Sequence, residues 1–327
     1  MKKVIILLGP TGVGKTAASI LLAERLNTEI ISSDSMQIYK HMDIGTAKQA
    51  IEEKRTVRHH MMDIVEPWES YSTGEYIKAV QPIIATLHDL NKIPIVVGGT
   101  GLYIKAMTRG IFSGPSADWD LRNELLEMEK ESPGYLHDYL NRLDPAAASK
   151  IMPADTRRIV RALEVCLKSD NVMSEMHRVL TKPLPYEFTK IGITRDRKEL
   201  YRLIEQRVDK MIEDGLVDEV KNIIQMIKKH FSNSSLVTHH PSLSSLQAIG
   251  YKEIAMHLNE KISLDEAVAL VKKRSRNYAK RQFTWFKKEE GIQWIDVTGI
   301  YEPFPIFQKI LSALNQKMRP DIEHMQS

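Results

Sequence analysis

The chain has 327 residues, of which 43% are hydrophobic and 27% are charged, and its formal net charge is +4. This composition excludes a fibrous or disordered chain, and the length exceeds what one hydrophobic core usually fills, so we expect a globular protein with two lobes. The single cysteine, Cys166, excludes an internal disulfide and a cysteine-based zinc site, and its helical setting predicts a structural thiol. The slight basic excess permits a polyanionic partner without requiring one.

The first predicted element is a short buried strand, 4–8, which leads into a glycine-rich turn and a helix. The turn has the spacing G-x-x-x-x-G-K-[ST] between strand and helix, the context in which this motif binds phosphate, and a turn that binds nothing would not need the complete motif. Backbone N–H groups, the helix N-terminus and the lysine supply positive charge, and the threonine is placed to hold Mg²⁺. The predicted diphosphate- or nucleotide-binding residues are Gly9, Pro10, Thr11, Gly12, Val13, Gly14, Lys15 and Thr16, with Thr16 as the metal ligand. The apolar run before the turn is too short for a membrane span, and it reads as a strand rather than a signal peptide, so we expect a cytoplasmic protein with no membrane partner.

Two further strands are predicted over 28–34 and 92–97, with a helix over 73–90 between them, a pattern typical of a parallel sheet. Asp34 closes the first of these strands, at the edge where open α/β sheets bind ligands. The second ends in Gly98-Gly99-Thr100, where an ATP-hydrolysing protein would carry a carboxylate for Mg²⁺. Asp63 follows too short an apolar run to fill that role. The equipment for ATP hydrolysis is therefore incomplete, and Asp34 is the carboxylate expected to face the phosphate loop.

The character of the chain changes from Ser113, and residues 118–168 are predicted to form consecutive helices. Arg157, Arg158 and Arg161 recur at helical spacing, and the last two share a face that is either solvated or anion-contacting. A long helical segment between parallel strands predicts an insertion or lid. A return strand is predicted over 188–194, followed by helices to about 229 and a serine-rich loop, 231–245, in which His239-His240 lacks a third metal ligand.

The second informative stretch, 265–290, is a predicted helix in which basic and aromatic residues alternate. Arg274, Tyr278, Arg281 and Trp285 fall on one stripe, whereas Ala279, Phe283 and Phe286 form a second, apolar stripe. Cations for phosphates and rings for unpaired bases are the chemistry of single-stranded RNA binding. The alternative is a solvated basic helix that packs its aromatic residues inward. A late strand is predicted over 292–296, and the tail beyond Gln316 is expected to fray.

Several motifs beyond the phosphate loop occur in a characteristic order: 33–39 (SDSMQIY), 43–48 (DIGTAK), 98–103 (GGTGLY), 161–164 (RALE), 247–253 (QAIGYKE) and 278–286 (YAKRQFTWF). Over about residues 4–296 the chain resembles the tRNA dimethylallyltransferase family, the bacterial tRNA isopentenyltransferases. The resemblance implies transfer of a dimethylallyl group from dimethylallyl diphosphate to N6 of the adenosine 3′ of the anticodon, with Mg²⁺, and it implies that the phosphate loop holds the prenyl donor rather than ATP. An extruded adenosine would enter a channel through the α/β core.

The resemblance also assigns roles to residues. The family's catalytic base matches Asp34, although a magnesium ligand or a cap remains an alternative, and Thr100 and Arg197 match groups that stabilise the leaving diphosphate. The family has a second arginine where this chain has Leu203, with Arg207 and Arg202 as alternatives for that cation. The residues expected to contact tRNA are Asp34, Ser35, Met36, Gln37, Thr100, Arg122, Arg157, Arg158, Ile159, Val160, Arg161, Leu246, Gln247, Ala248, Ile249, Gly250, Tyr251, Lys280, Arg281, Gln282, Phe283, Thr284, Trp285, Phe286 and Lys287.

The expected fold class is α/β, a parallel sheet of the phosphate-loop NTPase type with an inserted all-helical domain. The expected boundaries are 1–113 for the first part of the core, 114–187 for the insertion that contacts tRNA, 188–316 for the rest of the core with the basic helix, and 317–327 for the tail. The expected partners are the tRNA anticodon stem-loop and dimethylallyl diphosphate, and a monomer is the default.

Three alternatives are weighed against this function. A small-molecule phosphate-loop kinase explains the loop but not the basic aromatic helix. An adenylate isopentenyltransferase would need neither that helix nor the arginine-bearing insertion. A non-enzymatic RNA-binding protein would leave Asp34 and the diphosphate cradle without a purpose.

Overall fold

The computed structural model describes residues 2–49, 56–112, 114–169, 172–231 and 243–323. These residues form two compact units, one made of 1–104 with 185–327 and the other of 105–184. The expected loop at 231–245 lies largely outside the described residues, and so does His239-His240. No helix in the described ranges is both long and apolar enough to cross a membrane.

The first unit is built on a six-stranded parallel sheet in the order β3-β2-β4-β1-β5-β6, which confirms the α/β class. Its strands are β1 (Lys3–Leu8), β2 (Ile30–Ser33), β3 (His59–His60), β4 (Ile95–Gly98), β5 (Glu187–Thr194) and β6 (Ile292–Asp296). The central strand β1 is flanked by β4 and β5 with its apolar run wholly buried, as expected of a parallel strand covered on both faces. All carboxyl ends therefore meet at one edge, where the phosphate loop and Asp34 lie.

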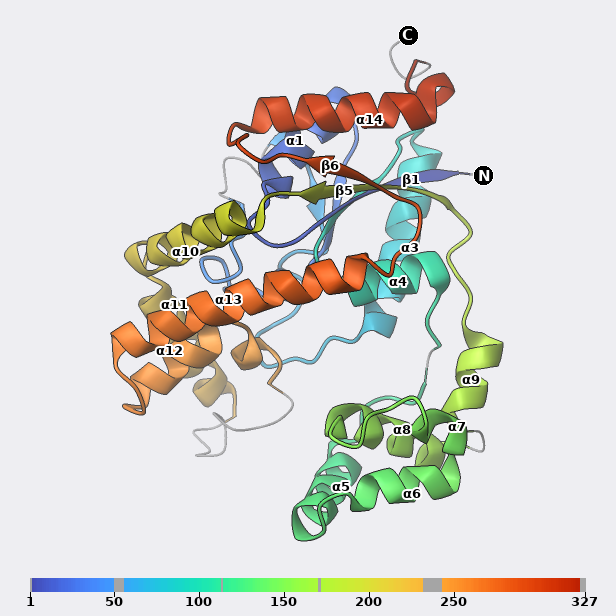
Figure 1. Cartoon of the computed structure of the whole chain (residues 1–327), viewed down its shortest axis with the longest axis vertical. Coiled ribbons are helices and arrows are strands. Elements are labelled where there is room, and N and C mark those ends of the chain that lie inside the picture. Colours follow the sequence, from blue (N-terminus) through green and yellow to red (C-terminus); the bar gives the residue numbers. More distant parts are fainter. Residues whose placement is uncertain (1, 50–55, 113, 170–171, 232–242, 324–327) are drawn as a thin grey trace. The chain divides into compact units, whose positions relative to one another are not determined.

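Helices cover this sheet and extend beyond its edge (Figure 1). They are α1 (Lys15–Arg25), α3 (Thr73–Asp89), α4 (Gly101–Arg109, which runs into the second unit), α10 (Arg197–Glu213), α11 (Leu216–His230), α12 (Tyr251–Leu258), α13 (Leu264–Phe286) and α14 (Pro303–Glu323), with a short 3-10 turn η2 (Ser245–Gln247). Helices α1 and α14 bury one face of the sheet in the main core, which includes Ile5, Leu22 and Ile310. The expected tail from 317 is wrong, because α14 continues to Glu323 across a kink at Met318, whose side chain is buried in that core.

A second core lies within the same unit and joins α11 and α12 to the segment after β2. Ile38, Tyr39 and Met42 from that segment pack with Leu216 of α11 and Tyr251 of α12. This core holds the DIGTAK motif against two helices that lie more than 170 residues later in the chain.

The second unit is entirely helical among its described residues. Its helices are α5 (Trp119–Glu131), α6 (Tyr135–Leu143), α7 (Pro145–Ala148), α8 (Thr156–Lys168) and α9 (Met173–Leu180). They enclose a small core of their own, in which Leu136, Leu140 and Leu163 have no exposed surface. The chain enters and leaves this unit near Gly110, which is close to the backbone of Lys182.

Candidate active site

A cavity of about 400 Å³ opens at the carboxyl edge of the sheet in the first unit. The cavity is lined by the phosphate loop, residues of β2 and β4 and their ends, the loop over 46–49, Met62, side chains from α10 and α13, and the start of α14 with the preceding Tyr301. The two chemical groups that the sequence singles out, the phosphate loop and the Asp34 carboxylate, therefore line one cavity.

The phosphate loop has the backbone geometry of an anion cradle. Gly9, Gly12 and Gly14 all have positive φ angles, and Gly14 is the residue from which α1 begins. The Lys15 ammonium folds back over the loop and donates to the carbonyl oxygens of Gly9 (3.0 Å) and Pro10 (2.7 Å). Burial lowers the pKa of Lys15 to about 7, although the carboxylate of Asp34 opposes that shift. A bound diphosphate would supply the negative charge that this lysine lacks.

Arg207, from α10, is the second cation of the cavity. Its guanidinium donates to the Thr11 hydroxyl at 2.7 Å, while its buried Nε has no partner among the described residues. Burial also lowers the pKa of this arginine, again against the charge of Asp34.

Arg197 lies elsewhere, so the structure corrects the expectation that it faces the phosphate loop. It is exposed at the start of α10, donates to the Tyr201 hydroxyl at 2.9 Å, and lines a separate cavity of about 530 Å³. That cavity also contains Lys280, Lys287 and the ring of Trp294, so it has the cations and aromatic faces of a nucleotide-contacting surface. In this structure Arg207, and not Arg197, is the arginine beside the phosphate loop.

Asp34 is half-buried immediately after β2. Within the described chain, the hydrogen bond to its carboxylate is donated to Oδ1 by the backbone N–H of Met36 at 2.8 Å. That bond closes a turn of the Asx type, so one carboxylate oxygen positions the side chain and the other is left for the cavity. The capping role and the role of a base are thus compatible.

Thr100 joins the ends of β2 and β4. Its hydroxyl accepts from the backbone N–H of Ser35 at 3.1 Å, and its own N–H donates to the Ser33 carbonyl at 3.1 Å. The Tyr278 hydroxyl of α13 also hydrogen bonds to Thr100. Burial and the nearby charge of Asp34 raise the pKa of Tyr278, so that this phenol stays protonated beside the carboxylate. The sequence places Tyr278 on the RNA-facing stripe and does not identify it as a neighbour of Asp34.

Gln282 has a role that the sequence did not predict. Its amide oxygen accepts from the Thr11 N–H at 2.9 Å and its amide nitrogen donates to the Gly99 carbonyl at 3.0 Å. The side chain thereby ties the phosphate loop to the end of β4. A Cβ atom on Gly99 would lie 2.1 Å from the Gln282 amide nitrogen, so a larger residue at this position would displace the Gln282 amide from its present contacts. Because both ends of the buried amide are used within the protein, Gln282 is not available to RNA in this structure.

The residues present fit a magnesium ion. Thr16 is exposed in the first turn of α1 and lines the cavity together with Asp34. Mg²⁺ is commonly held by one or two protein oxygens together with substrate phosphates and water, so this pair of oxygen donors is sufficient. The described residues contain no cluster of three histidine, cysteine or acidic side chains, which such a site does not need. Asp63 is not part of this site, because its carboxylate pairs with Lys48.

The expected RNA-contacting residues of α13 separate into exposed and buried groups. Lys280, Arg281, Thr284 and Lys287 are exposed, whereas Phe286 has 1% of its surface exposed and cannot face RNA. Phe283 and Trp285 lie between these groups: Phe283 packs partly against the main core, and the Trp285 indole, 37% exposed, packs over the backbone of Gly101. Arg274 of the same helix pairs with the buried Glu253. The helix is thus amphipathic, with a basic outer face and an inward face that serves the site.

The segment Leu246–Tyr251 is mostly internal. Leu246, Ala248 and Tyr251 belong to the second core, Gly250 is buried and Ile249 is half-buried, so Gln247 is the member whose side chain is exposed. The side chains of the 35–37 turn are half-buried, and Gln37 lines the cavity. The sequence could not distinguish a motif that contacts RNA from one that supports the loop beside the cavity.

The arginines of the helical unit that were expected to contact RNA form two groups, one exposed and one paired with a buried carboxylate. Arg157 and Arg158 are exposed on α8, but Ile159 and Val160 lie in the unit's core and do not face a partner. The remaining two arginines converge on Glu164, whose side chain has no exposed surface. Arg122 donates to it from Nε (2.9 Å) and from Nη2 (2.7 Å), and Arg161 pairs with the same carboxylate. This buried carboxylate accounts for the positions of Arg122 and Arg161.

The chain is similar to known proteins over most of its length. Residues 37–289 match the model of the family described as IPP transferase. A curated protein of Thermodesulfovibrio yellowstonii named tRNA dimethylallyltransferase is 56% identical over 315 residues, which are 96% of this chain and 98% of that protein.

Two solved structures are similar over the whole chain. The full-length tRNA isopentenylpyrophosphate transferase of Bacillus halodurans has a TM-score of 0.68 at 37% identity, covering 100% of this chain and 98% of that one. A eukaryotic dimethylallyltransferase, captured acting on tRNA, has a TM-score of 0.74 at 31% identity, covering 98% of this chain and 77% of that one.

Proposed function

The chain belongs to the IPP transferase family, and we propose that it is a tRNA dimethylallyltransferase. The donor is dimethylallyl diphosphate, the acceptor is N6 of the adenosine 3′ of the anticodon, and the second product is diphosphate. The observation that carries this proposal is that one cavity joins a phosphate loop to the carboxylate of Asp34. A diphosphate ester and a weakly nucleophilic amine are the two reactants that such a cavity suits.

The phosphate loop and its two cations hold the leaving group. The backbone donors of Gly12 and Gly14, the Lys15 ammonium and the Arg207 guanidinium offset the charge that builds on the diphosphate as the allylic C–O bond breaks. Because Arg207 is already bonded to the Thr11 hydroxyl, it is held beside the loop before the donor binds.

Asp34 acts as the base toward the acceptor. The lone pair of the exocyclic amine attacks C1 of the allyl group, the C1–O electron pair leaves with the diphosphate, and the N6 proton passes to the free carboxylate oxygen of Asp34. Thr100 and the protonated Tyr278 hold the turn and the strand end that position this carboxylate. No redox partner is required.

Thr16 would hold Mg²⁺, with Asp34 lining the same cavity. When bound, the ion supplies further positive charge to the departing diphosphate.

We propose that the tRNA anticodon stem-loop contacts the exposed basic residues of α13 and the exposed Arg157 and Arg158 of the helical unit. Lys280, Arg281 and Lys287 would contact phosphates, with Trp285 for stacking. The adenosine would leave its stack to reach Asp34, as chemistry on a base requires. Every residue invoked comes from one chain, so we propose that a monomer is sufficient, acting in the cytoplasm on tRNA.

The test is one incubation of the protein with labelled dimethylallyl diphosphate and Mg²⁺, offered unmodified tRNA and AMP in separate reactions. Label in tRNA, on the adenosine next to the anticodon, supports the proposal. Label in AMP alone would make the protein an adenylate isopentenyltransferase, and ATP hydrolysis without prenyl transfer would refute both assignments.

A further inference from the structure

One wall of the cavity is formed by a short loop. Thr46, Ala47, Lys48 and Gln49 line the cavity after the DIGTAK motif, and Met62 completes the wall from a segment that follows β3. Neither the phosphate loop nor Asp34 belongs to this wall, so its residues have no part in the chemistry described above.

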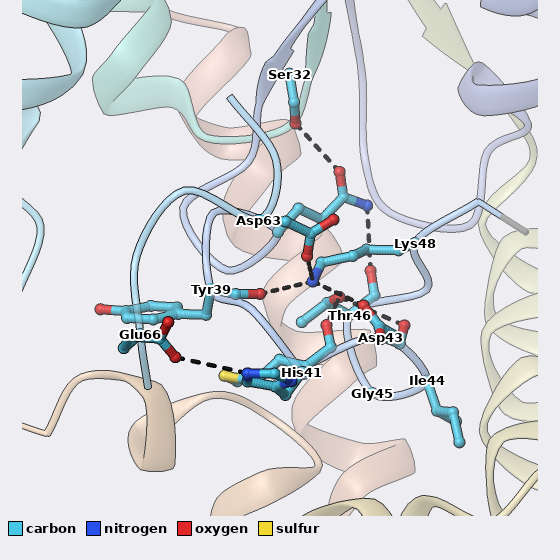
Figure 2. Close-up of polar contacts among 12 residues, drawn as sticks. Ser32, Tyr39, His41, Asp43, Ile44, Gly45, Thr46, Lys48, Asp63 and Glu66 are labelled. Carbon is cyan, nitrogen blue, oxygen red and sulfur yellow. Dashed lines mark hydrogen bonds and ion pairs between the residues drawn. The ribbon is translucent and has the colours of Figure 1, made fainter. Parts of the chain in front are cut away.

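Lys48 is the centre of this wall (Figure 2). Its side chain has no exposed surface, and its ammonium bonds to the Asp63 carboxylate (2.5 Å), the Tyr39 carbonyl (2.6 Å) and the Asp43 carboxylate (2.8 Å). One buried cation therefore connects the 43–48 loop to the 61–65 segment. Removing the charge of Lys48 would leave the carbonyl of the buried Tyr39 without this bond, and would release the more exposed carboxylates of Asp43 and Asp63 from the cation that joins them.

The two segments that Lys48 joins have unfavourable backbone angles. His41, Ala47, Met61 and Asp63 have φ angles of 64°, 50°, 63° and 54°, in the left-handed region that non-glycine residues rarely adopt. Such residues persist only where their surroundings over-determine them, and they concentrate at functional sites. Ala47 and Met61 lie at, or next to, the residues that face the cavity.

A second anchor holds the same loop from the other side. The Glu219 carboxylate of α11 accepts from the backbone N–H groups of Asp43 (2.9 Å), Ile44 (2.8 Å) and Gly45 (3.0 Å). The Tyr251 hydroxyl donates to the same carboxylate at 2.5 Å, and its ring lies where a Cβ atom of Gly45 would be. Gln37 adds bonds to the Thr46 and Ala47 carbonyls. The wall is therefore rigid as well as strained.

The cavity also has an apolar lining. It is lined by Ala17 of α1, Ile30 of β2, Val97 of β4 and Ile306 of α14, and Ala47 and Met62 line the same space. Asp34, which follows β2, lines this cavity as well. Apolar carbons of a donor whose diphosphate is in the phosphate loop would be most stable against these apolar side chains.

We propose that the Lys48-clamped wall sets the length of the isoprenoid donor, with Lys48 as a positioning residue that acts through Ala47 and Met62. This inference rests on the proposed prenyl transfer. A longer donor carries an additional five-carbon unit that must displace the wall, and a wall rejects a larger substrate only if it does not yield. Rigidity is what the Lys48 contacts provide.

The experiment compares kcat/KM for dimethylallyl and geranyl diphosphate, each with the same tRNA. Lys48→Met keeps the length of the side chain and removes the charge, and we expect the preference for the shorter donor to fall at least tenfold. The fraction of correctly folded enzyme cancels in this ratio, so a general loss of stability does not change it. Lys40→Met is the matched control, because Lys40 pairs with Glu66 on the same segment but does not line the cavity.

Met62→Ala removes an apolar side chain of the wall and leaves its charged residues unchanged. This variant alone tests the proposal if Lys48→Met does not fold. The kcat/KM for geranyl diphosphate, relative to that for dimethylallyl diphosphate, should rise in Lys48→Met and in Met62→Ala. The same ratio should stay at the wild-type value in Lys40→Met. A ratio within twofold of wild type in Met62→Ala, and in Lys48→Met if it folds, would overturn the inference. Transfer from dimethylallyl diphosphate by the wild-type protein tests the proposed function separately. A failure of the proposed function is therefore distinguishable from a failure of the inference about donor length.

Discussion

Replacing Gln282 with alanine tests whether this side chain supports the phosphate loop or contacts RNA. The substitution removes the hydrogen bonds of this side chain to the Thr11 N–H and the Gly99 carbonyl, and its hydrogen bond with the Tyr278 hydroxyl. Gly99 is buried, so its carbonyl loses its partner at a cost of about 1–3 kcal/mol, while the half-buried Thr11 N–H can bond to water at a net cost of about 1 kcal/mol. Two buried methylene groups add about 0.8 kcal/mol each.

The sum is about 3.6–5.6 kcal/mol of unfolding free energy, which urea denaturation followed by tryptophan fluorescence would measure. The phosphate loop would also lose its tie to β4, so we expect KM for dimethylallyl diphosphate to rise about tenfold, while the dissociation constant for tRNA changes less than twofold. Gln293→Ala is the control, because its side chain makes a 3.4 Å contact to Gln316 at an exposed position. A stability loss below about 0.5 kcal/mol together with a large loss of tRNA affinity would refute the reasoning and restore Gln282 to the RNA surface.

Three further predictions follow from the same contacts. Asp34→Asn should lower kcat by about 10²–10⁴ with little change in tRNA affinity, and wild-type turnover would remove the assignment of the base. Burial lowers the pKa of Lys15 to about 7, and we propose that its cation binds the diphosphate of the donor, so KM for the donor should rise as pH increases above 7, and Lys15→Arg should flatten that dependence. Burial opposes ionisation of Glu164, but Arg122, Asp118 N–H and Arg161 outweigh it and lower its pKa. A lowered folded-state pKa means that this stabilisation is present above the ordinary glutamate pKa and is lost as pH falls below it. Circular dichroism should therefore show loss of helix in acid. At neutral pH, Glu164→Gln should lower the free energy of unfolding by about 3 kcal/mol.

Much of the fold follows from the sequence because local signals agree with each other. The apolar run before Gly9, the helix from Thr73 and the strand over 292–296 each have the periodicity of the element found. Placing Asp34 at a strand end needs only the rule that parallel strands share their carboxyl edge. The prediction of a frayed tail from residue 317 was wrong, because the burial of Met318 against the main core is a tertiary effect that composition does not reveal.

The site was harder to predict because it depends on how helices dock. Arg197 and Arg207 both lie on α10, and only the rotation of that helix against the sheet decides which one faces the phosphate loop. Gln282 did have a signal: Ser275, Ala279, Gln282 and Phe286 recur at helical spacing and are all buried. A polar residue on such a stripe indicates a buried hydrogen-bonding role, whereas its charged neighbours in the sequence favour an RNA contact. The Lys48–Asp63 pair has no periodic signal at all.

The positions of the carboxylates separate this site from a phosphoryl-transfer site built on the same kind of loop. Gly98 at the end of β4 packs so closely on Ser33 that a Cβ atom there would lie 2.2 Å from the Ser33 carbonyl oxygen, and the next positions are Gly99 and Thr100. No carboxylate therefore stands where a phosphate-loop NTPase positions its metal ion, and Asp63 is bonded to Lys48. The carboxylate that lines the cavity, Asp34, follows the neighbouring strand β2, and we propose that it faces the acceptor amine rather than a water that would attack a phosphate. A scaffold that usually breaks the P–O bond of a phosphate ester is thereby suited to breaking the C–O bond of an allylic diphosphate.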